Sequence, residues 1–278
     1  MSAPKSLLEL PDGMHHDIPE ALYHEKILGL ANKGALDKVN RSPAHYLAWV
    51  MGKLAQEESP ALAFGKALHC RILEPTRFRR VYVVEPDFGD CRKKENREHR
   101  DAWRAEHAGA EHVDAETMAA LEGIAASIQA HPIAETLLGG GAAEVTAKWT
   151  DPETGIVCKA RGDLWINELG TLVDLKSTED ARPDEFARSV WKYRYHVQEA
   201  WYRDGFKAAG ADLEDFVFVA VEKKPPYAVA VYQLDEDAVT RGALAYEANL
   251  RRLAECIERD EWPAYGAEIR ELALPKWA

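Results

Sequence analysis

The chain has 278 residues, of which 46% are hydrophobic and 29% charged, and its apolar runs are too short to span a membrane. The formal net charge of −12 excludes a protein that coats nucleic acid through overall positive charge, but not an enzyme with a local DNA-binding groove. The N-terminal residues contain no apolar signal-peptide core, which predicts a cytoplasmic protein.

The first half of the chain, residues 15–140, is predicted to be mostly helical. One helix is predicted over 60–73, because Ser59 is typical of an N-cap and the proline after it of a first helical position. Another is predicted over 114–138, where Pro132 must end or kink it.

The second half, residues 143–260, is predicted to alternate strands and helices. Strands are predicted over 143–150, 156–166, 171–176, 215–222 and 227–234, and helices over 184–209 and 236–260. We find no linker or repeat, so we predict a single α/β domain over 1–278 with a helical N-terminal elaboration.

The four cysteines do not form a metal-binding pattern. They lie far apart at positions Cys70, Cys91, Cys158 and Cys256 and include no CxxC pair. Neither a zinc site nor an iron–sulfur cluster is therefore expected, and inert thiols in a reducing compartment are the simplest interpretation.

The hairpin over 156–176 gives the strongest indication of a site. If its turn makes Ile166 pair with Thr171, then Asp163 faces Asp174 across the two strands, with Cβ atoms roughly 5 Å apart. Two facing carboxylates repel one another. We therefore interpret them as ligands of a divalent cation, Mg²⁺ with Mn²⁺ as a substitute.

Lys176 lies two residues beyond Asp174, on the same face of its strand. Its ammonium group is placed to orient an attacking water or to stabilise charge that develops on a phosphate. The alternative is a solvated strand face with one ordinary ion pair. A register shifted by one residue would also remove the site, because it turns one strand's side chains to the other face.

The position of Glu144 depends on the preceding turn. If the loop is PETG, Asp151 pairs with Ile156, and Glu144 then faces Asp163. If the loop is the five-residue DPETG without a bulge, Glu144 points away from the site.

Three further polar residues lie on predicted helices. His69 is a lone histidine, and such residues are more often packed or solvated than metal ligands. Gln198 and Tyr202 are four residues apart on an aromatic helix stripe, a pattern that usually belongs to a core. On that stripe they are the members able to contact a phosphate or a bound water.

Several of these segments together resemble a known family. The order helix, three strands, helix and strand resembles the PD-(D/E)xK nuclease core, which has a restriction-endonuclease-like central mixed sheet flanked by helices. More closely, four motifs are similar to those of prophage-encoded RecE-type exonucleases (exodeoxyribonuclease VIII). They are GKALH at 65–69, CKARGDL at 158–164, VDLKST at 173–178 and QEAWY at 198–202. The resemblance covers roughly residues 15–260.

The resemblance implies roles for individual residues. The implied metal ligands are His69, Asp163, Asp174 and the carbonyl of Leu175. Lys176 would be the catalytic lysine, Glu144 would support the site, and Gln198 and Tyr202 would form its last motif. Gly162 stands where the name of the motif has proline.

The resemblance further implies a metal-dependent exodeoxyribonuclease that hydrolyses linear double-stranded DNA in the 5′ to 3′ direction. It would leave 3′ single strands for an annealing recombinase. The expected partners are DNA ends, such a recombinase and further copies of the chain, with no membrane. The residues expected to contact DNA are Arg92, Lys93, Lys94, Arg97 and Arg161. For the first four, a solvated charged helix is the alternative.

Two other functions remain open from the sequence. One is a single-strand or structure-specific nuclease related to RecB or Cas4. The other is a catalytically silent module that only binds DNA or a partner. Retention of both aspartates and the lysine argues against the silent module, because it has no need for repelling carboxylates.

Overall fold

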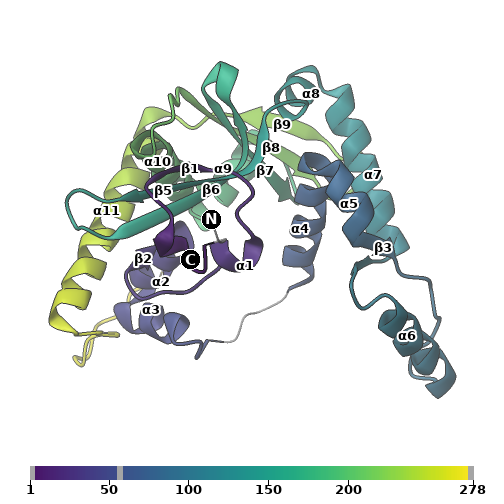
Figure 1. The fold of residues 1–278 in the computed structure, drawn as a ribbon, viewed down its shortest axis with the longest axis horizontal. Helices are drawn as coiled ribbons and strands as arrows, with labels where there is room; N and C mark the ends of the chain where they lie inside the picture. The colour runs from purple at the N-terminus through teal and green to yellow at the C-terminus, as the bar shows by residue number, and fades with distance from the viewer. Residues whose placement is uncertain (1–3, 55–58, 275–278) are drawn as a thin grey trace.

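The computed structural model describes residues 4–54 and 59–274, and it confirms the predicted α/β fold with a central mixed sheet (Figure 1). Within these residues the main sheet has seven strands in the order β1-β5-β6-β7-β8-β9, with β2 paired to β6. The β7–β8 and β2–β6 pairs are parallel and the others antiparallel. The strands of this sheet are β1 (Gly13–His15), β2 (Leu30–Ala31), β5 (Ala142–Thr150), β6 (Val157–Ile166), β7 (Thr171–Thr178), β8 (Asp215–Glu222) and β9 (Val229–Tyr232).

The helices begin and end close to their sequence signals. They are α1 (Glu20–Tyr23), α2 (Lys33–Arg41), α3 (Pro43–Val50), α4 (Pro60–Leu73), α5 (Pro75–Val81), α6 (Lys94–Glu106), α7 (Ala115–Ala130), α8 (Pro132–Leu138), α9 (Pro183–Lys192), α10 (Tyr195–Ala208) and α11 (Glu236–Arg259). Ser59 caps α4 by accepting from the Leu62 amide, and Pro132 separates α7 from α8 as predicted. The short parallel strands β3 (Tyr82–Val84) and β4 (Glu111–Val113), which the sequence did not predict, form a separate sheet.

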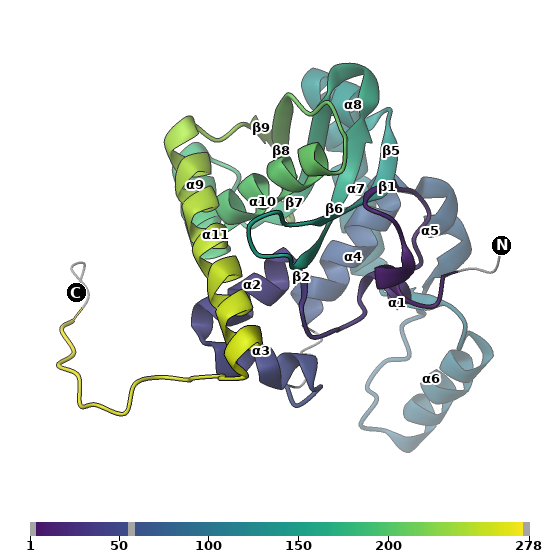
Figure 2. The ribbon, with the colours of Figure 1, turned by 60° about the vertical axis from the view of Figure 1, so that its left-hand side comes forward.

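Helices cover both faces of the main sheet (Figures 1 and 2), with a hydrophobic core on each face. On one face α10 packs on β5 and β6, and α2, α9 and α11 pack on α10, with Trp201 and Phe206 fully buried. On the other face α4 packs on β6 and β7, α8 packs on β9, and α7 packs on both helices, with Leu68 and Leu121 fully buried. Burying a large apolar side chain contributes roughly 1.5–3 kcal/mol, so both helical layers hold the central strands in place.

The helix predicted over 184–209 is in fact two helices, so this prediction was wrong. The chain breaks between α9 and α10, where Arg194 adopts a left-handed backbone with φ of 57°. The local sequence contains no glycine or proline at this point. A residue distant in the sequence stabilises the break, because the Arg194 guanidinium donates to Asp37 on α2 at 2.8 Å.

The polar residues on the odd positions of β6 are covered by the N-terminal segment. Lys159 is 1% exposed and donates to the backbone carbonyl of Glu25 at 3.1 Å. The guanidinium of Arg161 lies 4.0 Å from the Tyr23 ring and donates to the Ile18 carbonyl at 2.8 Å. Both faces of β6 are therefore buried along this stretch, although its sequence alternates like a strand with one solvated face.

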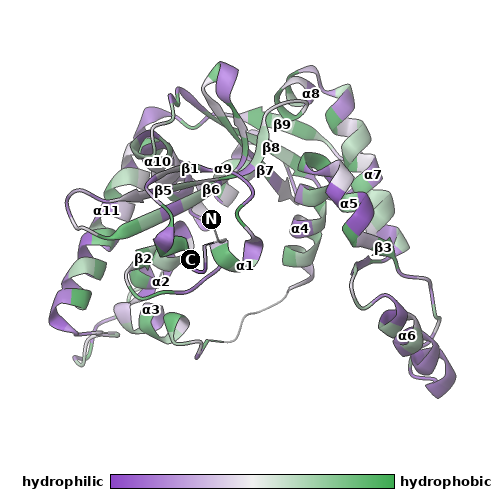
Figure 3. Ribbon diagram, in the orientation of Figure 1, coloured by the Kyte–Doolittle hydropathy of each residue, from purple (hydrophilic) through white to green (hydrophobic). Residues whose placement is uncertain are grey.

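Helix α6 extends away from the sheet in both orientations (Figures 1 and 2). It is almost wholly hydrophilic (Figure 3), and it contains no buried residue. Together with the loop before it, residues 88–106, we call it the charged arm. No helix among the described residues is both long enough and apolar enough to cross a membrane.

Candidate metal centre

The structure has the register considered for the second turn and, of the two alternatives for the first, the PETG loop. Ile166 pairs with Thr171, and the Asp151 amide donates to the Ile156 carbonyl at 2.9 Å, so the first turn is PETG. Pairing between β6 and β7 runs from this turn to Leu164 and Val173 and ends there. Asp163 and Asp174 are the next residues on each strand. They lie where the strands separate, a place we call the β6–β7 fork.

The β5–β6 pair changes faces at Glu144 and Asp163. Glu144 is opposite Asp163 in the register and has a left-handed backbone with φ of 53°. Before this point Ala143 packs with the α4-side core, and after it Val145 packs with the α10-side core. The alternation of apolar residues at the even positions of 158–166 predicts one shared face, but Cys158 and Ala160 pack in the α10-side core and Leu164 and Ile166 in the α4-side core. A non-glycine residue with positive φ is strained, and such strain is common at functional sites.

His69, Glu144 and Asp163 form a cluster of candidate ligands. One ligand atom from each lies within 4.8 Å of the others. His69 comes from α4, Glu144 from β5 and Asp163 from β6, so three separate elements meet here. We call these three residues the ligand cluster. The sequence analysis named all three residues: the hairpin register placed Asp163 opposite Asp174 and left Glu144 dependent on the turn, and the family resemblance implied His69.

The hydrogen bonds of His69 determine which ring nitrogen faces the carboxylates. Its Nε2 lies 2.7 Å from the Leu175 carbonyl, which can only accept, so Nε2 carries a proton. Its Nδ1 lies 3.6 Å from the Asp163 Oδ2. Metal-binding histidines commonly donate their second nitrogen to a carbonyl in this way. Leu175, expected as a ligand through that carbonyl, here orients His69.

Asp174 and Lys176 form a buried ion pair on the other side of the fork. The Lys176 Nζ lies 2.5 Å from Asp174 Oδ2, and the Gln198 amide donates to Asp174 Oδ1 at 2.5 Å. Asp174 is 1% exposed. Its Oδ2 is buried, and among the described residues the Lys176 ammonium group is the partner that compensates its charge. Asp163 Oδ2 accepts from the Leu175 amide at 2.9 Å, which joins the two sides.

Two carboxylates at the fork, those of Glu144 and Asp174, have raised pKa values. Burial, followed by repulsion from Asp163, raises the pKa of Glu144 to about 7. Burial also raises the pKa of Asp174 to about 6, although the Lys176 charge opposes the increase. For Lys176, burial lowers the pKa, but Asp174 and Asp163 raise it more, so it remains charged. Excess negative charge at the fork would be relieved by a bound cation.

Gly162 and Tyr202 complete the surroundings of the fork. A Cβ on Gly162 would lie 2.4 Å from Leu172 and 2.9 Å from Phe206, so glycine is required for β6 to approach β7 and α10. Burial, together with the nearby charges of Asp174 and Asp163, raises the pKa of Tyr202 well above its usual value. Tyr202 is thus a neutral neighbour of the fork.

The basic residues expected to contact DNA have different surroundings. Arg92 and Lys94 lie on the charged arm, with side chains 91% and 79% exposed. Lys93 and Arg97 are exposed there too. Arg161, in contrast, is 10% exposed and is engaged with the N-terminal segment, Thr146 and, at 4.0 Å, Glu144. It is available to support Glu144 rather than to reach a duplex.

Comparisons with other proteins agree with this fold. A family model described as a PDDEXK-like domain of unknown function (DUF3799) matches residues 33–273. A putative exonuclease from Eubacterium rectale is 14% identical, with a TM-score of 0.59 over 94% of this chain and 96% of that one. A phage-related exonuclease from Haemophilus somnus 129PT is 12% identical, with a TM-score of 0.31 over 76% of this chain and 100% of that one. No curated protein matches the sequence. At these identities the first likeness supports the fold alone, and the second carries no argument.

Proposed function

Because the chain belongs to this family of PDDEXK-like domains, we propose that it is a metal-dependent deoxyribonuclease. One observation carries the proposal. The ligand cluster adjoins the buried Asp174–Lys176 pair at a single fork between two strands. Repelling carboxylates beside a fixed ammonium group are costly for a structural sheet, but they suit hydrolysis of a phosphodiester.

The side chains present fit a divalent cation. His69, Glu144 and Asp163 would hold it, and Asp174, whose Oδ2 is paired with the Lys176 ammonium group, is proposed as a further ligand beside them. Carboxylate-rich sets of this kind favour Mg²⁺, and the imidazole makes Mn²⁺ an effective substitute. When bound, the cation supplies Lewis-acid chemistry at the phosphate.

Lys176 is the proposed catalytic residue. Its ammonium group is fixed by Asp174 and lies 4.9 Å from the centre of the Tyr195 ring, so it is held without side-chain freedom. A pre-oriented cation stabilises charge that develops on a phosphate oxygen at little reorganisation cost. Gln198 positions Asp174 through its amide, and the neutral Tyr202 lies near the same carboxylates.

The proposed substrate is linear double-stranded DNA. The RecE-like motifs support degradation in the 5′ to 3′ direction, with 3′ single strands left for an annealing recombinase in the cytoplasm. The exposed basic residues of the charged arm support contact with the duplex backbone. The fork chemistry is the same at an end and inside a duplex, so restriction to ends must come from access. Neighbouring copies of the chain and the N-terminal helices are the proposed source of that restriction.

Equal masses of supercoiled and linearised plasmid test the proposal. We expect release of acid-soluble nucleotides from the linear form with Mg²⁺ or Mn²⁺, and none from the closed circle. The Lys176→Ala chain serves as the inactive control. Nicking of the circle would show that the protein is an endonuclease and not an end-dependent exonuclease. Cleavage confined to single strands would favour a RecB-like enzyme, and no cleavage of any DNA would leave a silent binding module.

A further inference from the structure

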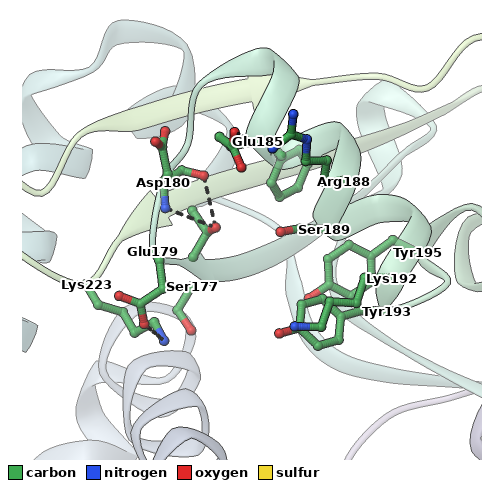
Figure 4. A pocket seen from close by; sticks show the side chains of 12 residues that line it. Ser177, Glu179, Asp180, Glu185, Arg188, Ser189, Lys192, Tyr193, Tyr195 and Lys223 are labelled. Carbon is green, nitrogen blue, oxygen red and sulfur yellow. Dashed lines mark hydrogen bonds and ion pairs between the residues drawn. The ribbon is translucent and has the colours of Figure 1, made fainter. Parts of the chain in front are cut away.

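A pocket lies next to the candidate metal centre, directly beyond the proposed catalytic lysine. Strand β7 continues past Lys176 to Ser177, and α9 then folds back across its end, so that Ser189 and Tyr195 face the strand (Figure 4). The pocket has a volume of about 280 Å³. This is just below the roughly 300–1,000 Å³ of small-molecule pockets, so the pocket has room for at most a single nucleotide and not for a duplex.

The charges of the pocket are balanced except at one residue. Glu179 pairs with Lys223 at 2.6 Å, and Glu185 pairs with Arg188 at 3.0 Å. The third acid is paired as well, since Asp180 lies 2.7 Å from Arg182 just outside the pocket. Lys192 is exposed, and no described carboxylate lies within 4.0 Å of its ammonium group. It is therefore available to an anionic ligand.

Two tyrosine rings connect Lys192 to the fork. Lys192 Nζ lies 5.1 Å from the centre of the Tyr193 ring, which stacks on Tyr195 with centroids 5.7 Å apart and planes at 28°. Tyr195 in turn lies 4.9 Å from Lys176 Nζ. Tyr193 remains 49% exposed, so part of its surface is open. Figure 4 shows Lys192, Tyr193 and Tyr195 together on one side, with Glu179 and Lys223 across the pocket.

The backbone between α9 and α10, beside Lys192 and Tyr193, is strained. Arg194, which follows Tyr193, has the left-handed backbone that breaks α9 from α10. Asp37 holds it through an ion pair to Arg194 at 2.8 Å and a second to Lys33 at 2.8 Å. Lys33 also donates to the Tyr193 carbonyl at 2.9 Å. A continuous helix would avoid the strain but would not place Lys192 and Tyr193 at the end of β7.

We propose that this pocket binds one nucleotide of the DNA strand next to the bond that is cut. The base stacks on the exposed Tyr193 ring and its phosphate contacts Lys192, which is the usual combination for single-stranded DNA. The inference rests on the proposed nuclease function. It adds to that function a subsite that fixes the position of the DNA strand relative to the bond that is cut. Neither Tyr193 nor Lys192 belongs to the ligand cluster or to the buried ion pair.

Binding of a fluorescent base analogue tests the subsite without requiring cleavage. The full chain is mixed with Ca²⁺, whose looser coordination poorly supports hydrolysis. The probe is an oligonucleotide that carries 2-aminopurine at one of the first three positions from either end. Stacking on a tyrosine quenches its fluorescence. We expect quenching at one position, retained in Tyr193→Phe and abolished in Tyr193→Ala.

Affinity and turnover give a second readout. Removal of one stacking partner weakens binding by roughly 5- to 100-fold, so KM should rise in Tyr193→Ala while kcat changes little. The slope of log K against log salt is negative. Lys192→Gln should make it less steep by about 0.7, the value for one single-strand phosphate contact. Trp191→Ala is the matched control, because this neighbouring aromatic is 71% exposed but lies outside the pocket.

The outcomes separate the subsite from the nuclease function. Quenching that persists in Tyr193→Ala, or that disappears equally in Trp191→Ala, would overturn the subsite even if wild type degrades DNA. Tyr193-dependent quenching in a chain that never cleaves DNA would support the subsite and refute the nuclease. Melting temperatures of the three aromatic variants confirm that each is folded.

Discussion

On one side of the β6–β7 fork, the Asp174 carboxylate has an ammonium group and an amide as partners, and both come from this chain. On the other side, Glu144 and Asp163 lie together beside a histidine ring. The nearest cation there, Arg161, is 4.0 Å from Glu144 and is shared with the N-terminal segment. The first side is charge-compensated by the fold itself. The second lacks such a partner, and in the proposed function a cation from solution would supply it.

The largest expected effect separates the two sides by function. Both Lys176→Ala and Asp163→Asn should lower kcat by at least roughly 10²–10³-fold, as removal of one pre-oriented charge does in other enzymes. Their metal binding should differ. Calorimetric titration with Mn²⁺ should show binding in Lys176→Ala and none in Asp163→Asn. If Lys176→Ala no longer binds Mn²⁺, the lysine has a structural role and the comparison fails.

The next effect concerns the free energy of unfolding without metal. Asp174→Asn removes the partner of a buried ammonium group and should cost about 3 kcal/mol. Asp163→Asn removes one of two neighbouring carboxylates and should be neutral or stabilising. Urea titrations in the presence of a chelator measure both. Equal destabilisation of the two variants would show that the two sides of the fork are not differently compensated.

Metal binding should appear as a smaller gain in stability. Mn²⁺ at 100 times its dissociation constant should add about 2.7 kcal/mol to the wild-type protein. Glu144→Gln should reduce this gain by removing one ligand, while raising or leaving unchanged the melting temperature without metal. Thermal denaturation of Lys176→Ala provides the control, since it should retain the full gain. A Glu144→Gln chain that gains as much as wild type would remove Glu144 from the ligand set.

The smallest effect lies far from the fork, on the charged arm. The four residues to be changed to serine together are Arg92, Lys93, Lys94 and Arg97. Binding should weaken alike for every DNA sequence. The negative slope of log K against log salt should become less steep by up to roughly 0.9 for each duplex phosphate that these side chains neutralise. Arg251→Ser is the control, because that arginine is also paired with neighbouring acids but lies on α11, outside the charged arm. An unchanged salt slope would mean that the arm is a solvated helix.

The parts of the site that depend on local chemistry could be predicted from the sequence. The two turns specify how many residues separate paired positions, so turn length suggested the Ile166–Thr171 pair and limited the earlier turn to two alternatives, of which the structure has the Asp151–Ile156 pair. The N-cap at Ser59 likewise defined the helix that carries His69. The motif resemblance selected His69 from ten histidines, which periodicity could not have done.

Contacts between distant segments determine where each residue lies relative to the fork. Such contacts form only in the folded chain. The face change at Glu144 depends on a strained backbone that two opposing cores hold in place. The break before α10 depends on Asp37, which lies 157 residues away from Arg194 in the chain. The cover over Arg161 comes from residues 18–23. Periodicity reports the local preference of the backbone, whereas ion pairs and packing between distant segments select among conformations of similar local energy.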